Sequence, residues 1–386
     1  MSDTMPNSAR ILVVGTGPVG YVTAIALAQA GHRVTLVGID VPPERDGRTV
    51  ALLDGSVQFL RALGLWDGIV PNAAPLSKMR MIDETGSLFR APPVTFKSSE
   101  IGLNAFGYNI ELTDLVLYLS DEAKRTVGLV KKSGQVVDLS SNSHGDCEIT
   151  LDTGEKLIAH LLVGADGKAS PVRGFANISF KQWDYPQMAL TALLSHRLDH
   201  QDISTEFHTR HGPFTLVPLP GRRSSLVWMM PPGLANHMAT LGDLEFQVEV
   251  EKQSKSMLGR MVVEGKRSLI PMSGLSASRY AAGNIALVGE AAHVFPPIGA
   301  QGLNLGFRDV SALAAELGKS ADVEAFRRYD RVRQADVKLR TLAVDLLNRS
   351  LLADLMPVDF ARSLGLLTVA SVPPLRRFMM QRGAGH

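Results

Sequence analysis

A glycine-rich turn near the N-terminus constrains the fold of this chain more than any other feature, because strand and helix patterns flank it on both sides. Ile11–Val14 form an apolar run typical of a strand buried on both faces of a parallel sheet. Apolar residues recur with helical spacing over Val19–Ala30, and Gly31 follows as a C-terminal cap. The β-branched run Val34–Val37 then predicts a second strand, so the chain begins with a right-handed βαβ unit.

The turn itself has the sequence Gly15-Thr16-Gly17-Pro18-Val19-Gly20, which is the G-x-G-x-x-G pattern of dinucleotide-binding units. The first glycine permits a tight turn, the second lets backbone approach a pyrophosphate, and the third lets helix and strand pack closely. The helix N-terminus favours the negative phosphates. An ordinary glycine turn is the alternative, and the strand–helix–strand context argues against it.

The acidic residue that usually binds the adenosine ribose is missing from the end of the second strand, where Gly38 stands. Asp40 is the nearest carboxylate that could reach the 2′-hydroxyl. A solvated loop aspartate is an equal alternative for Asp40.

Two further glycine turns follow predicted buried strands. The strand 160–163 leads into a turn with Asp166, Gly167, Ser170 and Arg173. The strand Ile285–Val288 leads into a segment that can present backbone N–H groups to a bound ligand. The residues of that segment are Gly289, Glu290, Ala291, Ala292, His293, Pro296, Gly299, Gly302, Leu303 and Asn304.

Composition excludes several classes of function. The net charge is +2, and no basic stripe carries interleaved aromatic residues, so a nucleic-acid partner is not expected. The single cysteine, Cys147, excludes an intrachain disulfide and the paired thiols of a disulfide-reducing flavoenzyme. No spacing of His, Asp or Glu predicts a metal site.

No targeting or membrane-spanning segment is expected, which predicts a cytoplasmic protein. Met1–Arg10 lacks the apolar middle of a secretory signal. The apolar stretch Ser363–Leu375 is shorter than the roughly 20 residues that cross a bilayer. The apolar segment Leu351–Met380 carries Arg376 and Arg377, so it could rest peripherally on the inner face of the membrane; helix packing or a dimer contact is the alternative.

The three glycine blocks, in this order, resemble the FAD-dependent aromatic hydroxylases of the para-hydroxybenzoate hydroxylase group. Within that group the chain is most similar to the ubiquinone-biosynthesis hydroxylases, of the 2-polyprenylphenol and 2-polyprenyl-6-methoxyphenol hydroxylase type. The resemblance covers nearly the whole chain. Further matching strings are Asp46-Gly47-Arg48, Gly64-Leu65-Trp66, His211-Gly212-Pro213 and Ser225-Leu226-Val227-Trp228.

The resemblance implies an α/β fold, with a Rossmann-like FAD-binding domain, a mostly antiparallel β substrate domain and C-terminal helices. The FAD-binding domain is predicted to be discontinuous, over 1–76, 101–179 and 272–345. Short strands and proline clusters mark 180–271, which with 77–100 is predicted to form the substrate domain, and 346–386 is predicted to be a C-terminal helical segment. Helices are expected over Gly302–Leu317 and Val323–Leu347.

The resemblance also implies roles for individual residues. Gly15, Gly17, Pro18 and Gly20 would hold the FAD pyrophosphate, and Arg48 would be a cation beside it. Asp166 and Gly167 would serve FAD and the pyridine nucleotide, while Gly289 and Glu290 would lie at the ribityl or ribose hydroxyls. Glu290 replaces an aspartate there, and its extra methylene shifts the carboxylate. Pro296, Gly299, Gly302, Leu303 and Asn304 would wrap the isoalloxazine, with Pro296 and Gly299 at the catalytic cleft.

Structural alternatives stand beside several of these roles. Arg48 could be a surface cation and Asp166 a turn cap. His293 is interpreted as structural, because the flavin performs the oxygen chemistry. His208 and His211 are interpreted as strand-edge or turn residues.

The implied reaction uses NADPH or NADH as a transient reductant of FAD. O2 would then form a flavin C4a-hydroperoxide that attacks the ring of a polyprenylated phenol, and other ubiquinone-synthesis proteins are expected partners. Two alternatives stay open. One is a hydroxylase of a small soluble phenol, and the other is a non-catalytic FAD-binding subunit of a hydroxylase assembly, suggested by Gly38 and Glu290.

Overall fold

The computed structural model describes residues 10–39, 45–86, 92–143, 145–295 and 301–336, and a few residues near the C-terminus. Those few are Pro374, Arg376, Arg377, Met380, Gln381 and Ala384. The predictions for Asp40, Pro296 and Gly299, and for the helices beyond residue 336, lie outside the described residues. No helix in these ranges is long and apolar enough to cross a membrane.

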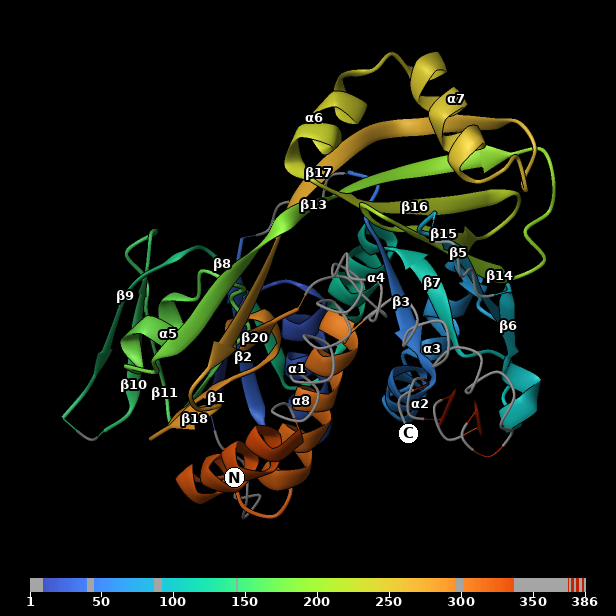
Figure 1. Ribbon diagram of the computed structural model, residues 1–386. Coiled ribbons are helices and arrows are strands. Elements are labelled where there is room, and N and C mark those ends of the chain that lie inside the picture. The colour runs from blue at the N-terminus through green and yellow to red at the C-terminus, as the bar shows by residue number, and fades with distance from the viewer. Residues whose placement is uncertain are drawn as a thin grey trace.

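A six-stranded sheet forms the base of the molecule (Figure 1). Its strand order is β18 (Ala281–Ala282), β19 (Ile285–Leu287), β12 (Leu161–Gly164), β1 (Arg10–Val14), β2 (Arg33–Gly38) and β8 (Leu129–Ser133). All neighbouring strands are parallel except β18 and β19. The parallel pairing of β1 with β2 confirms the predicted βαβ unit and the Rossmann-like fold class.

Helices pack around this sheet through one large apolar core. They are α1 (Pro18–Gln29), α4 (Leu112–Arg125), the short α5 (Pro171–Phe175) and α8 (Gln301–Leu317). α1 contacts both α4 and α8, and it begins at Pro18, within the first glycine turn. Residues 323–336 are also helical, in agreement with the prediction for that segment.

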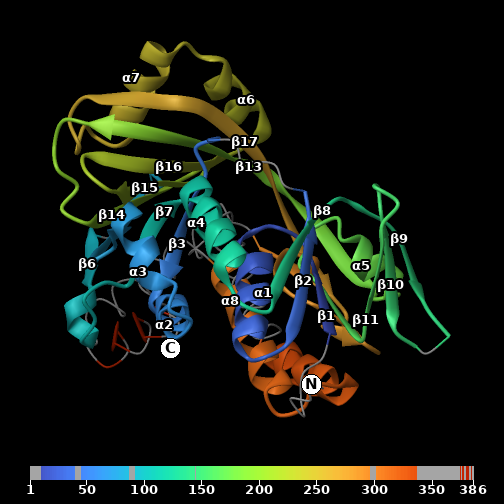
Figure 2. The ribbon, with the colours of Figure 1, turned by 180° about the vertical axis from the view of Figure 1, so that it is seen from behind.

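Two small sheets and a group of short helices complete the base. One sheet joins β3 (Thr49–Leu53), β7 (Gly107–Glu111) and β4 (Ala73–Pro75), next to α2 (Asp54–Ala62), α3 (Trp66–Ile69) and the 3-10 helix η1 (Val70–Asn72). The other joins β9 (Val136–Ser141), β10 (Cys147–Leu151) and β11 (Lys156–Ala159). Seen from behind, the sheet with β3 and β7 and its short helices lie on one side of β1 and β2, and the β9–β10–β11 sheet lies on the other side (Figure 2).

An eight-stranded sheet lies above the base. Its order is β20 (His293–Val294), β17 (Met261–Ala277), β13 (Phe180–His196), β16 (Arg223–Met230), β15 (Gly212–Leu219), β14 (Ile203–Thr209), β5 (Lys78–Glu84) and β6 (Val94–Lys97). The pairs are antiparallel except β14 with β5. α6 (Pro232–Thr240) and α7 (Asp243–Gln253) cover its outer face through a second apolar core, so its inner face is turned toward the base (Figure 1).

The strands between residues 180 and 271 are longer than the sequence predicts. β13 and β17 each have 17 residues and pair with each other over most of that length. Both run from the side of the six-stranded sheet up into the large sheet, so they connect the two parts of the molecule (Figures 1 and 2). The exact domain limits remain a prediction.

Candidate functional site

The three predicted glycine turns meet at one edge of the six-stranded sheet. The N–H of Gly15 donates to the carbonyl of Val37, at 2.8 Å. The N–H of Ala165 donates to Val14, at 2.7 Å, and the N–H of Val288 donates to Gly164, at 2.9 Å. Since these bonds join the carboxyl ends of adjacent parallel strands, the loops that follow share the edge where such sheets bind ligands.

Two glycines of the first turn are required by packing against the protein itself. A Cβ built on Gly15 would lie 2.1 Å from the carbonyl oxygen of Ala165, and the φ of Gly15 is +121°. A Cβ on Gly20 would lie 1.9 Å from the carbonyl oxygen of Gly15. Any side chain at either position would therefore push the turn and α1 away from the strand ends.

Gly17 differs from both, because a Cβ at this position would meet nothing within 4 Å in the described part of the chain. Gly17 is the N-cap residue of α1 and has no side chain that could cap the helix. Pro18 follows as the first helical residue. The helix therefore presents its N-terminal dipole and uncapped N–H groups toward open space. This arrangement fits a dinucleotide pyrophosphate.

The end of β2 carries no carboxylate, as expected from the sequence, and the structure shows what fills that space. A Cβ at Gly38 would lie 2.6 Å from Cγ2 and 2.7 Å from Oγ1 of Thr16. The Thr16 hydroxyl donates to the carbonyl of Ile39, at 3.1 Å. A hydroxyl group and a backbone carbonyl thus stand where related sites have an acid.

Asp166 uses both carboxylate oxygens within its own turn. Oδ1 accepts from the Ser170 hydroxyl at 2.6 Å, and Oδ2 accepts from the Val172 N–H at 3.0 Å. Burial raises the pKa of the Asp166 carboxyl above its usual range, against the opposing effect of these hydrogen bonds. Within the protein, Asp166 therefore makes the contacts of a turn cap, which is its structural alternative. Gly167 beside it has a φ of +80°.

Arg173 links the second glycine turn to the third, a connection that the sequence pattern does not reveal. Its Nη1 donates to the carbonyl of Ala291 and its Nη2 to the carbonyl of Lys168, each at 2.8 Å. The buried guanidinium also stacks over the Phe180 ring, 4.2 Å from its centroid. The N-terminal part of β13 is thereby held against both loops.

The third turn exposes the side chain of Glu290 and anchors its backbone inside. Glu290 lies in the 3-10 helix η3 (Gly289–Ala291) and is exposed, while both neighbours are buried. Gly289 has a φ of +61°, and a Cβ there would lie 3.1 Å from the methyl groups of Val19. The Glu290 carboxylate is therefore accessible to a ligand that lies along the glycine turns.

Asp309 on α8 anchors this turn and was not identified from the sequence. Its Oδ2 accepts from the Gly289 N–H at 2.8 Å and contacts Nε2 of His293 at 2.6 Å, and its Oδ1 accepts from Nε of Arg333 at 2.7 Å. Burial would raise the pKa of the Asp309 carboxyl, but His293 and Arg333 outweigh it and hold that pKa below its usual range. His293 thus has a structural contact, as the sequence interpretation expects.

The first turn of α8 contains Gly302, Leu303 and Asn304. The Asn304 side chain is buried against the start of α2: its Oδ1 accepts from the Leu53 N–H at 2.8 Å and the Ser56 hydroxyl at 2.6 Å. Its Nδ2 donates to the carbonyl of Ala51 at 2.8 Å. Any contact from Asn304 to a cofactor therefore depends on its backbone N–H group. That group is in the first turn of α8, as the N–H groups assigned to the pyrophosphate are in the first turn of α1.

Arg48 lies directly before β3, in a segment of the base that contacts β17 of the large sheet. Its Nε donates to Asp46 at 2.6 Å, and its side chain is half exposed. The Asp46 carbonyl accepts from the Ser268 hydroxyl at 2.8 Å. The exposed guanidinium fits the surface-cation alternative, and its position in solvent leaves it able to turn toward a phosphate.

The described residues hold no cluster of His, Cys, Asp or Glu suited to a metal ion. Cys147 is buried and free, and burial raises the pKa of its thiol to about 11. Thiol chemistry at neutral pH is therefore not expected at this residue.

A family model described as "FAD binding domain" matches residues 8–339. This chain belongs to that FAD-binding family. Ubiquinone hydroxylase UbiL of Rhodospirillum rubrum is 31% identical over 390 residues, covering 98% of this chain and 90% of the relative. The 3-demethoxyubiquinol 3-hydroxylase of Escherichia coli is also 31% identical, covering 97% and 98%.

Solved structures show the same fold at lower sequence identity. The p-nitrophenol 4-monooxygenase PnpA from Pseudomonas putida matches with a TM-score of 0.78 and 18% identity, over 97% of each chain. HpxO of Klebsiella pneumoniae, complexed with FAD and uric acid, matches with a TM-score of 0.76 and 17% identity, covering 96% of this chain and 97% of that chain. The chain is an FAD-dependent monooxygenase of the aromatic hydroxylase type, with NAD(P)H as the reductant typical of this family.

Proposed function

We propose that this enzyme hydroxylates the aromatic ring of a polyprenylated phenol in ubiquinone biosynthesis, using O2 and NAD(P)H. The support is the full-length similarity to two relatives whose names state ubiquinone hydroxylation. A third relative, the COQ6 monooxygenase of Drosophila melanogaster, is named for ubiquinone biosynthesis and is 28% identical, covering 97% of this chain and 90% of the relative.

The observation that carries the cofactor assignment is the open, uncapped helix end at Gly17. We propose that the FAD pyrophosphate lies against Gly15, Gly17, Pro18 and Gly20. The N–H groups of the first α1 turn would bind it, while Gly15 and Gly20 keep the turn compact. Arg48 would exchange Asp46 for a phosphate when FAD is bound.

The other two turns would hold the middle of the cofactor and the ring. Glu290 would accept hydrogen bonds from ribityl or ribose hydroxyls, because its carboxylate is exposed beside Gly289. Asp166 and Gly167 would shape the second turn, and Asp40 would reach the adenosine ribose. Gly302, Leu303 and Asn304 would present backbone N–H groups to the isoalloxazine, with Pro296 and Gly299 at the substrate side.

Bound FAD supplies the activation of O2, and the chain's own residues bind, orient and exclude water. The large sheet would contribute the side chains that receive the phenol, since its inner face is turned toward the base. Buried charges such as Asp309 and Arg333 would keep the loops in one geometry during turnover.

The C-terminal segment would bring the enzyme to its lipid substrate. The support is the apolar sequence over 351–380 with Arg376 and Arg377 near its end, of which Arg376 is already paired with Glu100. Flotation with vesicles containing anionic lipid tests this: the full chain should float with them, and an Arg377→Glu variant should float less. Complete absence of binding would remove the membrane contact from the proposal.

Complementation tests the proposed reaction directly. The chain would be expressed in bacterial strains that each lack one ubiquinone hydroxylation step, and the quinone intermediates would be measured. We expect one intermediate to disappear and ubiquinone to return in at least one strain. Expression of FAD-loaded protein with no rescue in any strain would contradict the proposed substrate.

A further inference from the structure

β13 has an irregularity where it crosses from the base into the large sheet. Asp184 pairs with Ser273 of β17 and Met188 pairs with Pro271, so Tyr185, Pro186 and Gln187 lie opposite Met272 alone. A bulge of this kind bends a strand and re-aims its side chains, and bulges are frequent beside active sites.

Gln187 at the end of this bulge has a buried acceptor with no partner among the described residues. The residue is 3% exposed, and its Nε2 donates to the carbonyl of His211 at 3.1 Å. Because a backbone carbonyl can only accept, this bond fixes the orientation of the amide. Oε1 therefore points away from His211, and no donor in the described part of the chain reaches it. A buried acceptor left unpaired is costly, which points to a donor supplied by a ligand.

An apolar patch adjoins this acceptor. Ala189, Met229 and Met272 are each at most 3% exposed and form a cluster separate from the core beneath α6 and α7. A Cβ on Gly212 would lie 2.8 Å from Nε2 of Gln187 and 2.7 Å from the carbonyl oxygen of Met229, so the Gln187 amide lies beside this patch. Ala189 faces away from its neighbour Leu190, which belongs to the core under α6 and α7, so the patch is on the inner face of the sheet.

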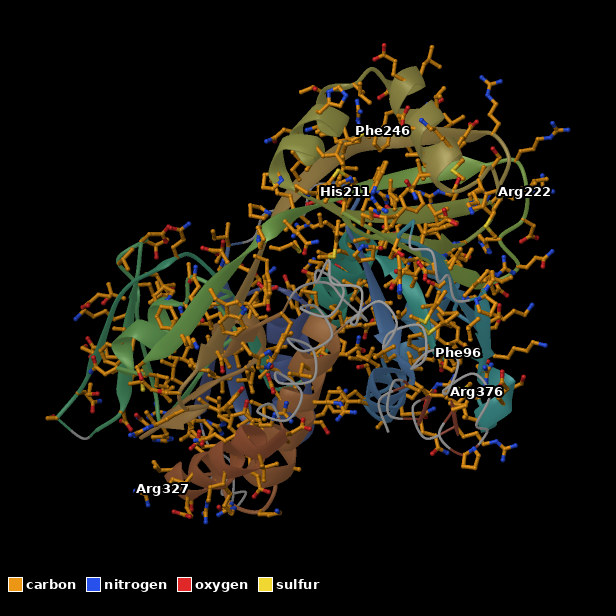
Figure 3. The ribbon with its side chains drawn as sticks, viewed as in Figure 1. Phe96, His211, Arg222, Phe246, Arg327 and Arg376 are labelled. Carbon is orange, nitrogen blue, oxygen red and sulfur yellow. The ribbon has the colours of Figure 1, made fainter. Side chains whose placement is uncertain are left out.

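The position of this face agrees with the cofactor assignment. Val294, two residues before the segment assigned to the isoalloxazine, pairs with Leu275 on β17, three residues from Met272. His211 lies at the large sheet, above the base that carries the glycine turns (Figure 3). A ring on the patch would therefore be on the side of the large sheet that carries β20, directly before the segment assigned to the isoalloxazine.

We propose that Gln187 Oε1 accepts a hydrogen bond from the ring hydroxyl of the phenol substrate while the ring rests on Ala189, Met229 and Met272. This inference rests on the proposed function and names the residue that recognises the phenol. A neutral amide suits this buried position, since a carboxylate acceptor here would require a buried positive partner. Gly212 makes the arrangement possible, because a Cβ there would lie 2.8 Å from Nε2 of Gln187.

Thr191 offers a matched control on the same strand. Its hydroxyl is also buried, has no partner within the described ranges and lies on the same side of β13 as Ala189. However, strand geometry places it about 13 Å from Gln187. Its neighbours Ala192 and Leu193 lie against Gly47 of the loop from the base. We expect Thr191 to take no part in phenol recognition.

The test measures the affinity of the FAD-loaded full chain for 2-geranylphenol and for geranylbenzene, which lacks the hydroxyl donor. Flavin absorbance changes on titration give both dissociation constants. Wild type should prefer the phenol by roughly tenfold or more. Gln187→Met should lose this preference, whereas Thr191→Val should keep it.

Several outcomes would overturn the inference. A Gln187→Met variant with lower thermal stability but an unchanged phenol preference would show that Gln187 only supports the fold. Equal affinity of wild type for both compounds would also overturn the inference. If wild type still hydroxylated 2-geranylphenol in that case, the proposed function would stand. If wild type neither bound nor hydroxylated the phenol, the proposed function and this inference would both fail.

Discussion

The side chain of Thr16 fills the space that a side chain at Gly38 would need. A Cβ at position 38 would lie 2.6 Å from Cγ2 and 2.7 Å from Oγ1 of Thr16, closer than real contacts allow. The two positions are therefore coupled. A carboxylate at residue 38 requires a smaller residue at position 16. Gly38 leaves room for the Thr16 side chain, whose hydroxyl donates to the carbonyl of Ile39.

This coupling predicts the behaviour of a double variant. Gly38→Glu alone should weaken FAD binding, because Thr16 must shift toward the cofactor. Thr16→Ala combined with Gly38→Glu should bind FAD more tightly than wild type, by about tenfold, since a carboxylate can then reach the ribose hydroxyls. Reconstitution of the apoprotein, followed by flavin fluorescence, measures this, with Thr16→Ala alone as the control. Equal affinities of the single and double Glu variants would contradict the coupling.

The glycines of the first turn should separate cofactor binding from folding. Gly17→Val should abolish bound FAD without lowering the melting temperature of the apoprotein, because its side chain enters open space where the phosphates would lie. Gly233→Val is the matched control, since a Cβ there also meets no described atom within 4 Å, and it should retain FAD. Flavin absorbance and differential scanning calorimetry report the two effects.

Gly20→Ala should show the reverse order of effects. Its Cβ would lie 1.9 Å from the Gly15 carbonyl oxygen, so the apoprotein itself should be destabilised. The melting temperature should fall before any FAD is added. An apoprotein of unchanged stability would show that the turn relaxes and that the packing argument is wrong.

Asp309→Asn should destabilise the protein strongly at neutral pH. The carboxylate is fully buried between Arg333, His293 and the Gly289 N–H, and removal of one partner from such a group costs about 3–5 kcal/mol. Urea unfolding of apoprotein near pH 7 measures the loss. FAD affinity should fall as well, because Gly289 and Glu290 lose their anchor.

The same contact predicts a pH dependence of known sign. The folded-state pKa of Asp309 lies below its usual value of 3.8, so its contribution to stability is present above about pH 4 and is lost as pH falls through the folded pKa. The difference in unfolding free energy between wild type and Asp309→Asn should therefore shrink as the solution is acidified below about pH 4. A difference that stayed constant on acidification would contradict the charged state assigned to Asp309.

Cys147 should be unreactive in the folded protein. Its thiol is buried, and its pKa is raised to about 11, so little thiolate forms at neutral pH. A disulfide reagent should modify it only at the rate of unfolding, and added urea should accelerate the reaction. Fast modification of native protein would show that the β9–β10–β11 sheet opens around its central strand.

The local parts of the fold could be predicted because their signals lie within a few residues of each other. The apolar run, three glycines and helical spacing identified β1, α1 and β2. The other two turns were found for the same reason. Their meeting at one sheet edge follows from parallel pairing, which the βαβ pattern already implies.

The missed parts depend on contacts between distant segments. Asp309 is 20 residues from Gly289 and 24 from Arg333, and nothing in the spacing marks it as their shared partner. The contact of Arg173 with Ala291 spans 118 residues. The lengths of β13 and β17, and the bulge at Gln187, arise because two strands extend from one sheet into another. Such features appear only once tertiary packing is known.

Oxygen-isotope labelling tests the central claim most directly. FAD-loaded enzyme would be supplied with NAD(P)H, 2-geranylphenol and ¹⁸O2, and the product would be analysed by mass spectrometry. We predict a ring-hydroxylated product that carries one ¹⁸O atom, and no product from the Gly17→Val variant, which lacks bound FAD. A product with oxygen from water, or equal turnover by the FAD-free variant, would contradict the assignment of these glycine turns to a flavin monooxygenase.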